Sequence, residues 1–184
     1  MPSSSSSLSK NFVVIQKNII VKKDGHASWF LENRDKFKEL YLDYQKYDDR
    51  VVKIFDITDD GKIVMEFLDG FTLDDYEKMK NLDLQTLKYI YSEFIDVHMK
   101  MLLYKHNSLK DDLIWYHFDL LSKNFMWCGD RLRLIDPDHF RLNFLRAGNF
   151  SILNKMNKGL EEIETTITLS QSLKYGPHWG KNFY

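Results

Sequence analysis

The sequence predicts an α+β fold in two unequal parts, a small antiparallel sheet with one helix followed by a mainly helical part. Short runs of β-branched and aromatic residues, separated by turns that contain Gly or Asp, fill much of the first third of the chain. Long amphipathic helical patterns prevail from Leu82 onward. With 184 residues, 43% of them hydrophobic, the chain is long enough to bury the core of one domain with two small lobes.

The first lobe is expected to span residues 11–68, after a serine-rich stretch over 1–10 whose composition is typical of a disordered tail. The helix shows an apolar stripe at i, i+3 and i+4 spacing, and the last two strands meet across the turn Thr58-Asp59-Asp60-Gly61. The expected elements are strands over 11–16, 19–22 and 51–57, a helix over 28–47, and a strand over 62–70 that ends in Gly and leads into the second lobe.

The second lobe is expected to span residues 69–184. Its longest helix carries a stripe of Leu, Ile, Phe, Val and Met that would form the core of the lobe. Two short strands flank Gly129-Asp130, which suits a two-residue hairpin turn. The aromatic stretch 175–184 is expected to dock onto this lobe or onto another chain. The expected elements are helices over 82–106 and 149–167 and strands over 124–128 and 131–135.

Three oxygen-bearing side chains stand around this hairpin. Asp119 and Asn124 are five residues apart on a short loop, and Asp136 comes directly after the apolar run that ends at Ile135. A hairpin would hold Asn124 at its start and Asp136 at its end, so that both face one cleft. Mg²⁺ takes oxygen ligands, usually one or two from the protein and the rest from water and phosphates. Asp119 would then be left to orient an attacking hydroxyl or to accept its proton.

The segment His117-Phe118-Asp119-Leu120 with Asn124, followed by Leu134-Ile135-Asp136, resembles the catalytic loop and the metal-binding segment of protein kinases and of the kinase-like aminoglycoside phosphotransferases. The resemblance implies a two-lobed protein kinase-like fold that transfers the γ-phosphate of ATP, with Mg²⁺, to a hydroxyl acceptor on a protein or a small molecule. It implies that Asp119 is the catalytic base, that Asn124 and Asp136 bind the metal, and that His117 supports the loop.

The resemblance also implies a Lys–Glu pair that positions the phosphates. Ile19-Ile20-Val21-Lys22 resembles the strand that carries this lysine, and Glu39 lies on the expected helix at a fitting distance before the next strand. Lys17 and Lys23 are alternatives for the lysine, and Glu32 is an alternative for the glutamate.

The run from Lys62 to Gly70 resembles the kinase hinge, whose backbone binds adenine. On this alignment Met65 is the gatekeeper. The backbone contacts would come from Glu66, Phe67 and Leu68.

Several positions depart from the kinase pattern. Phe118 stands where regulated kinases have the Arg that pairs with a phosphorylated activation loop, so control by that route is not expected. Pro137-Asp138 replaces Phe-Gly, as in small-molecule phosphotransferases, and Asp138 would hold a second metal or cap the next segment. Lys123 lies four residues after the base and is expected to be a catalytic residue that acts on the substrate. No glycine-rich loop precedes Lys22, and both lobes are shorter than in protein kinases.

Composition narrows the function classes. A net charge of -1 gives no basic excess that would favour nucleic acid, and the single Cys128 excludes an internal disulfide. The sequence shows neither the apolar core of a signal peptide nor an apolar run long enough to cross a bilayer, so a cytoplasmic protein is expected. Richness in Lys, Asn, Ile and Tyr suits an AT-rich genome, such as that of a virus or phage. Two alternatives to an enzyme are a pseudokinase-like module that binds a nucleotide or a protein without turnover, and an α+β interaction domain.

Overall fold

The computed structural model describes residues 12–16, 19–22, 33–59 and 61–175, and the side chains of 33–59 and 61–169. The tails expected over 1–10 and 175–184 therefore lie outside the described residues, except for the backbone of Tyr175. The elements are β1 (Phe12–Gln16), β2 (Ile19–Lys22), α2 (Arg34–Tyr47), β3 (Ile54–Ile57), β4 (Ile63–Glu66), β5 (Phe71–Thr72), α3 (Tyr76–Met79), α4 (Leu84–Leu103), β6 (Leu113–His117), η1 (Ser122–Asn124), β7 (Phe125–Trp127), β8 (Leu132–Leu134), η2 (Pro137–His139), β9 (Phe140–Phe144) and α5 (Leu145–Tyr175).

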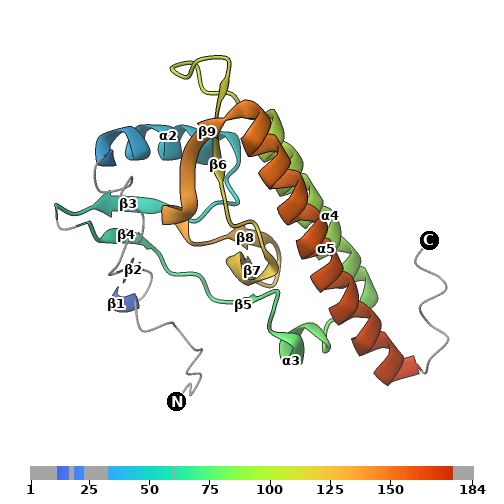
Figure 1. Cartoon of the computed structure of the whole chain (residues 1–184). Coiled ribbons are helices and arrows are strands. Elements are labelled where there is room, and N and C mark those ends of the chain that lie inside the picture. The colour runs from blue at the N-terminus through green and yellow to red at the C-terminus, as the bar shows by residue number, and fades with distance from the viewer. Residues whose placement is uncertain (1–11, 17–18, 23–32, 60, 176–184) are drawn as a thin grey trace.

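The first part of the chain is a four-stranded antiparallel sheet in the order β1-β2-β4-β3, with α2 beside it (Figure 1). The inner face of α2 carries Phe37, Leu40, Tyr41 and Tyr44, all of them buried. The hydroxyl of Tyr41 donates to the carbonyl of Val52 over 2.7 Å, which fastens the helix to the segment before β3.

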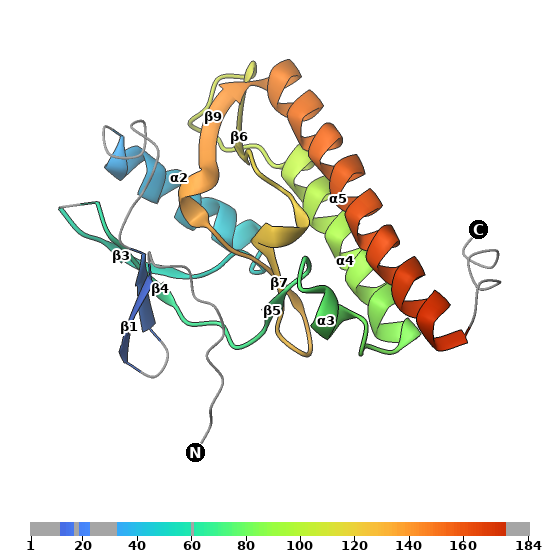
Figure 2. The ribbon, with the colours of Figure 1, turned by 60° about the horizontal axis from the view of Figure 1, so that its bottom comes forward.

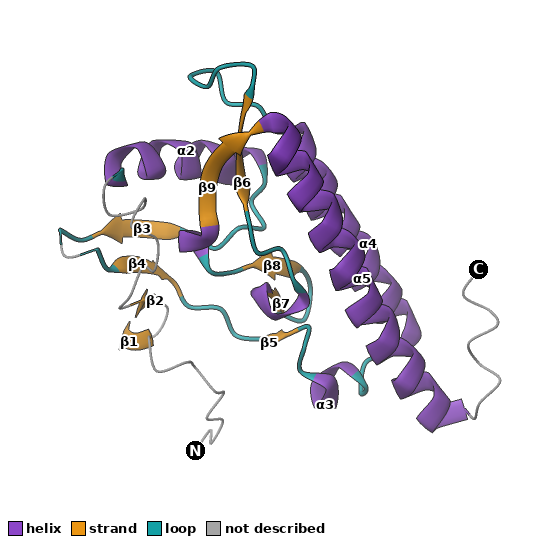
Figure 3. Ribbon diagram, in the orientation of Figure 1, coloured by secondary structure: helices purple, strands orange, loops and turns teal. Residues whose placement is uncertain are grey.

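The second part is built on two long helices. α4 and α5 lie side by side along their length in both views of the ribbon (Figures 1 and 2). Against them lie a three-stranded sheet in the order β5-β7-β8 and the antiparallel pair β6-β9 (Figure 3). The segment 67–70 joins β4 of the first sheet to β5 of the second. The predicted fold class, α+β with a small antiparallel sheet and a mainly helical second part, is confirmed.

One hydrophobic cluster runs through both parts. The ring of Phe37 on α2 meets Trp115 on β6 edge-on at 5.4 Å, and Tyr41 meets Phe140 in the same way at 5.2 Å. A parallel bridge also joins Val51 to Leu134 of β8. The two parts therefore share one core, which fixes the first sheet relative to the hairpin β7-β8.

The observed elements differ from the predicted ones mainly at their ends. The helix predicted over 82–106 is α4, which begins after Asp83 because that carboxylate accepts the backbone N–H of Thr86 over 2.8 Å as an N-cap. The helix predicted over 149–167 is α5 and is longer at both ends. The strand predicted over 51–57 is shorter, since regular pairing begins at Ile54.

The pair β6-β9 was not predicted from the sequence. The residues of β6 read Leu-Ile-Trp-Tyr-His, and all but the first are buried. A strand covered on both faces lacks the alternation of polar and apolar residues that identifies a strand in a sequence. This strand matters because it ends at His117, directly before the loop that carries Asp119.

Candidate active site

The hairpin β7-β8 brings Asn124 and Asp136 to the same end of two paired strands. Phe125 pairs with Leu134, and the backbone N–H of Ile135 donates to the carbonyl of Asn124 over 2.9 Å. The far end of the hairpin turns at Gly129, whose φ of 93° suits glycine. The predicted hairpin is thus confirmed, and it places the two residues at the same end of its paired strands.

His117 links this hairpin to the loop of Asp119. Its Nδ1 accepts the backbone N–H of Asp119 over 3.2 Å, and its Nε2 lies 3.1 Å from the backbone carbonyl of Asp136. An imidazole that accepts through one nitrogen and donates through the other is neutral. Burial, helped by the nearby His139, lowers the pKa of His117 to about 3, which agrees with the neutral form.

Asp136 is held in an unusual backbone conformation. Its φ of 60° and ψ of 63° lie in the left-handed region, and it is the one non-glycine residue with positive φ in the described ranges. Such a conformation is uncommon for a residue with a Cβ and clusters at functional sites. The contact from His117 to its carbonyl and the start of η2 at Pro137 hold it there.

The carboxylate of Asp119 is almost buried and is contacted on both oxygens. Lys123 Nζ lies 2.8 Å from Oδ2, and Lys155 Nζ on α5 lies 3.3 Å from Oδ1. Burial alone would raise the pKa of Asp119, but the two ammonium groups outweigh it and lower the pKa to about 2. The group is therefore ionised at neutral pH, the state in which a carboxylate can accept a hydrogen bond from a hydroxyl and then its proton.

Asn124 is buried and faces Asp119. Its Nδ2 donates to the backbone carbonyl of Asp119 over 2.6 Å and to Oδ2 over 3.0 Å, so Oδ1 is its oxygen for a cation. Asp138 is only 1% exposed, which sets its carboxylate in the interior. Among the described residues no group of three or more His, Cys, Asp and Glu side chains could hold a metal. The oxygens of Asn124 and Asp136 fit a hard cation that takes its other ligands from phosphates and water.

The residues predicted to position the phosphates are only partly described. Lys22 ends β2 opposite Ile63, and its side chain lies outside the described part, as do Lys17, Lys23 and Glu32. Glu39 lies on α2, where Lys36 Nζ donates to both of its oxygens over 3.1 Å and the Ser108 hydroxyl donates to one of them over 3.3 Å. These contacts turn Glu39 toward the loop after α4.

The predicted hinge runs from β4 into the connection between the two sheets. Met65 is 2% exposed and pairs with Ile20 and Ile54, so it lies in the middle of the first sheet. The backbone N–H of Glu66 already donates to the carbonyl of Lys53 over 2.9 Å. An adenine contact from Glu66 would therefore use its carbonyl. Phe67 and Leu68 are partly buried against the core.

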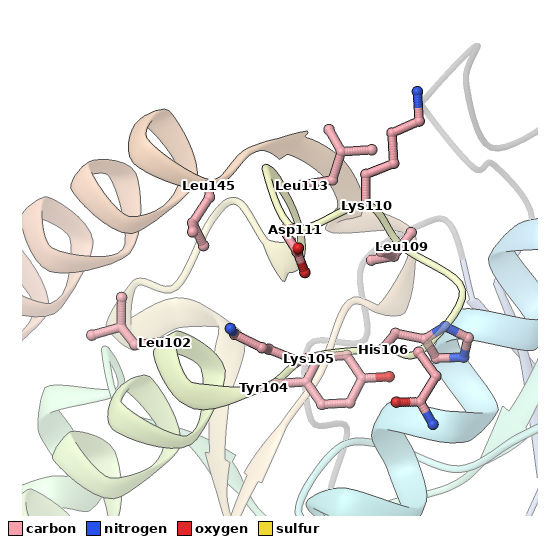
Figure 4. Close-up of a pocket in the computed structure, with 10 residues that line it drawn as sticks. Leu102, Tyr104, Lys105, His106, Leu109, Lys110, Asp111, Leu113 and Leu145 are labelled. Atoms are coloured by element: carbon pink, nitrogen blue, oxygen red, sulfur yellow. The ribbon is translucent and has the colours of Figure 1, made fainter.

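Among the cavities of the described part of the chain, two bear on the predicted site. One, of about 580 Å³, is bounded by Leu121, Ser122 and Lys123 and by the α5 residues Lys158 and Glu162, among others. Because Lys123 both lines this cavity and contacts Asp119, the cavity adjoins the site. The other, of about 210 Å³, lies between the ends of α4 and β6 (Figure 4). None of the predicted site residues lines it.

Sequence reasoning missed three residues of the site, namely Lys155, His139 and Glu162. His139 Nδ1 lies 3.9 Å from Asp119 Oδ2, and Glu162 on α5 accepts the hydroxyl of Ser122. His139 could have been predicted, because it lies three residues after Asp136 in the sequence. Lys155 and Glu162 carry no signal in the sequence, because nothing there shows which face of α5 meets the loop.

The chain is similar in structure to several solved kinases. The choline kinase LicA from Streptococcus pneumoniae matches with a TM-score of 0.47 and 17% identity, over 87% of this chain and 70% of that one. The streptomycin-ATP-APH(2")-IIa ternary complex matches with a TM-score of 0.41 and 14% identity, over 84% and 72% of the two chains. The amicoumacin kinase hAmiN, in complex with AMP-PNP, Ca²⁺ and Ami, matches with a TM-score of 0.35 and 13% identity, over 90% and 79%.

These similarities concern the fold alone. The sequence itself matches no protein-family model and no curated protein. Within the described ranges, no helix combines the length and the apolar character needed to cross a membrane.

Proposed function

We propose that this chain is an ATP-dependent phosphotransferase that acts on a hydroxyl group of a small molecule. The observation that supports it best is that the ring of His117 contacts the backbone of both Asp119 and Asp136. Asn124 adds its own contact with Asp119. These contacts among His117, Asp119, Asn124 and the backbone of Asp136 support the proposal.

In this proposal Asp119 is the catalytic base, and Asn124 and Asp136 supply the protein oxygens for Mg²⁺. Bound there, the ion would neutralise charge on the phosphates. The acceptor hydroxyl would reach Asp119 from the cavity beside Lys123. The acceptor oxygen bonds to the γ-phosphorus while the bond to the bridging oxygen breaks, ADP leaves, and the hydroxyl proton passes to Asp119.

The nucleotide would lie between the first sheet and the hairpin β7-β8. Lys22 would hold the phosphates. Glu39 is the partner expected from the sequence, and it would have to exchange its contacts with Lys36 and Ser108 for that pair. The backbone of residues 66–68 would contact adenine beside Met65. Asp138, which is buried, would hold a second metal or cap the segment that follows, the two roles expected from the sequence.

The test is transfer of labelled γ-phosphate from ATP with Mg²⁺ to small hydroxyl compounds and to water. Asp119→Asn is expected to lower the rate at least about 100-fold, because a positioned base contributes about 10² to 10⁴. Asp136→Asn should lower it similarly. The matched control is Asp130→Asn, at the exposed far turn of the same hairpin, which should keep the wild-type rate.

A separate measurement of ATP binding distinguishes an enzyme from a protein that binds nucleotide without turnover. Binding of ATP without turnover by the wild type would replace the proposal by a pseudokinase-like module. Turnover that persists in Asp119→Asn would reject the assignment of the base.

A further inference from the structure

The two oxygens of Asp119 are held in different ways. Oδ2 is contacted by Lys123 at 2.8 Å and by Asn124 at 3.0 Å, with His139 at 3.9 Å. These three residues all lie within twenty positions of Asp119 in the chain. Oδ1 is contacted by Lys155 at 3.3 Å, from a helix thirty-six residues away. The loop therefore holds one oxygen, and α5 holds the other.

This division matters for the orientation of the carboxylate. The last torsion of an aspartate side chain has a broad energy minimum, so contacts on one oxygen alone leave the carboxylate plane poorly fixed. Each carboxylate oxygen has about two lone-pair directions. Oδ2 already meets an ammonium and an amide, whereas Oδ1 meets only Lys155 among the described side chains. Oδ1 is thus the oxygen with a lone pair left for an acceptor hydroxyl.

Lys155 is placed to hold this arrangement firmly. Its side chain is about one-third exposed, and the residue lies on the same helix as Ile152, Gly159 and Ile163, which are buried against the rest of the molecule. An ammonium has three donors, so one can hold Oδ1 while the others remain for an oxygen of the acceptor.

We propose that Lys155 is a positioning residue, which orients Oδ1 of Asp119 toward the acceptor hydroxyl from helix α5. This inference rests on the proposed phosphotransferase function and goes beyond it, since it makes α5 part of the active site. Displacements of about 1 Å in such groups can cost about 100-fold in rate.

The experiment measures kcat and KM for hydrolysis of Mg-ATP, with water as the acceptor. Lys155→Met is expected to lower kcat by about 10- to 100-fold and to leave the KM for ATP within about twofold. Lys155→Arg should recover much of the loss, because it restores a cationic donor to Oδ1. Lys110→Met removes a lysine from the loop before β6 and should match the wild type.

A double variant separates positioning from a general structural effect. If Lys155 acts through Asp119, then Asp119→Asn/Lys155→Met should be no slower than Asp119→Asn alone. Two losses that multiply would overturn the inference, as would an unchanged kcat in Lys155→Met or a KM for ATP that rises in proportion.

Failure of the inference is distinguishable from failure of the proposed function. A wild type that turns ATP over and loses activity in Asp119→Asn, but not in Lys155→Met, would keep the function and reject the role of Lys155. A folded wild type without turnover would reject both. If Lys155→Met does not fold, Lys155→Gln and Lys155→Arg give the same comparison with smaller changes in packing.

Discussion

His117 decides the geometry of the site although it faces no substrate in our proposal. It is completely buried, and its two ring nitrogens contact backbone groups of Asp119 and Asp136. Because these contacts are made to backbone atoms, His117 itself occupies neither carboxylate. The neutral ring of His117 therefore fixes the backbone positions of Asp119 and Asp136, from which the two carboxylates extend.

The backbone of Asp136 gives a prediction that does not depend on activity. For L residues the left-handed conformation costs about 1–2 kcal/mol, which glycine avoids. We therefore expect Asp136→Gly to be more stable than Asp136→Ala by about 1 kcal/mol, as measured by urea unfolding. Within α5 the order should reverse, and Asn157→Ala should be more stable than Asn157→Gly by about 1 kcal/mol. Equal stability of the two variants at position 136 would contradict the conformation.

The residues of the site differ in how far the sequence could predict them. Asp119, Asn124 and Asp136 could be predicted to converge because a short loop and a hairpin connect them, and local connection fixes their distance. Lys155 could not, since its contact with Asp119 depends on how a distant helix packs. Whether Glu39 pairs with Lys22 stays a prediction, because the side chain of Lys22 lies outside the described residues.

At the scale of elements, the packing of α5 on α4 brings Lys155 and Glu162 to the loop of Asp119. Gly159 lies at a close approach of the two helices, where an added Cβ would lie 2.4 Å from the ring of Phe94. That ring is fully buried and packs against His98 and Phe125, so it has little room to move. A glycine in the middle of a helix is thus explained by a contact that the helical pattern does not show.

Gly159→Ala is expected to destabilise the protein, although alanine is the better helix former by about 1 kcal/mol. Overpacking of a close-packed core costs about 1–3 kcal/mol, and the two effects together predict a net loss of up to about 2 kcal/mol. Asn157→Ala, at an exposed position two residues earlier, should instead raise stability slightly. Thermal unfolding of both variants tests this, and a stabilised Gly159→Ala would show that the helices lie further apart.

The elements were predictable where an amphipathic pattern or a turn identified them. The hairpin β7-β8 and helix α4 were of this kind. The pair β6-β9 was not, because a strand such as β6, buried on both faces, has no alternation to detect. The far end of α5 was missed for a different reason, since its apolar stripe continues only weakly beyond Ile167.

At the scale of the whole molecule, the two parts are joined by polar contacts as well as by the shared core. Arg133 on β8 donates to the carbonyls of Arg50 and Val51, both over 3.2 Å, and to the carboxylate of Glu66 at the end of β4. This arginine therefore contacts both the connection before β3 and the predicted hinge. Glu66 was predicted to contact adenine through its backbone. Its side chain has a second role, since the contact with Arg133 holds the predicted hinge against β8.

Removal of Arg133 should weaken the whole molecule, because it leaves the mostly buried carboxylate of Glu66 without its cation. The side chains of Arg133 and Glu66 are 10% and 17% exposed, and breaking a buried pair of this kind costs about 3 kcal/mol. The matched control is Arg131, on the same hairpin, whose pair with Asp49 at 2.7 Å is more exposed, with side chains that are 34% and 73% exposed. Arg131→Met should cost less than about 1 kcal/mol.

A double-mutant cycle with Arg133→Met and Glu66→Met, followed by urea unfolding, measures the interaction itself. We expect a coupling free energy of at least about 1 kcal/mol and a single unfolding transition in every variant, since the hydrophobic core runs through both parts. Additive losses would show that Arg133 stabilises only the backbone of Arg50 and Val51. Two separate transitions in Arg133→Met would show instead that this contact, more than the shared core, makes the two parts unfold together.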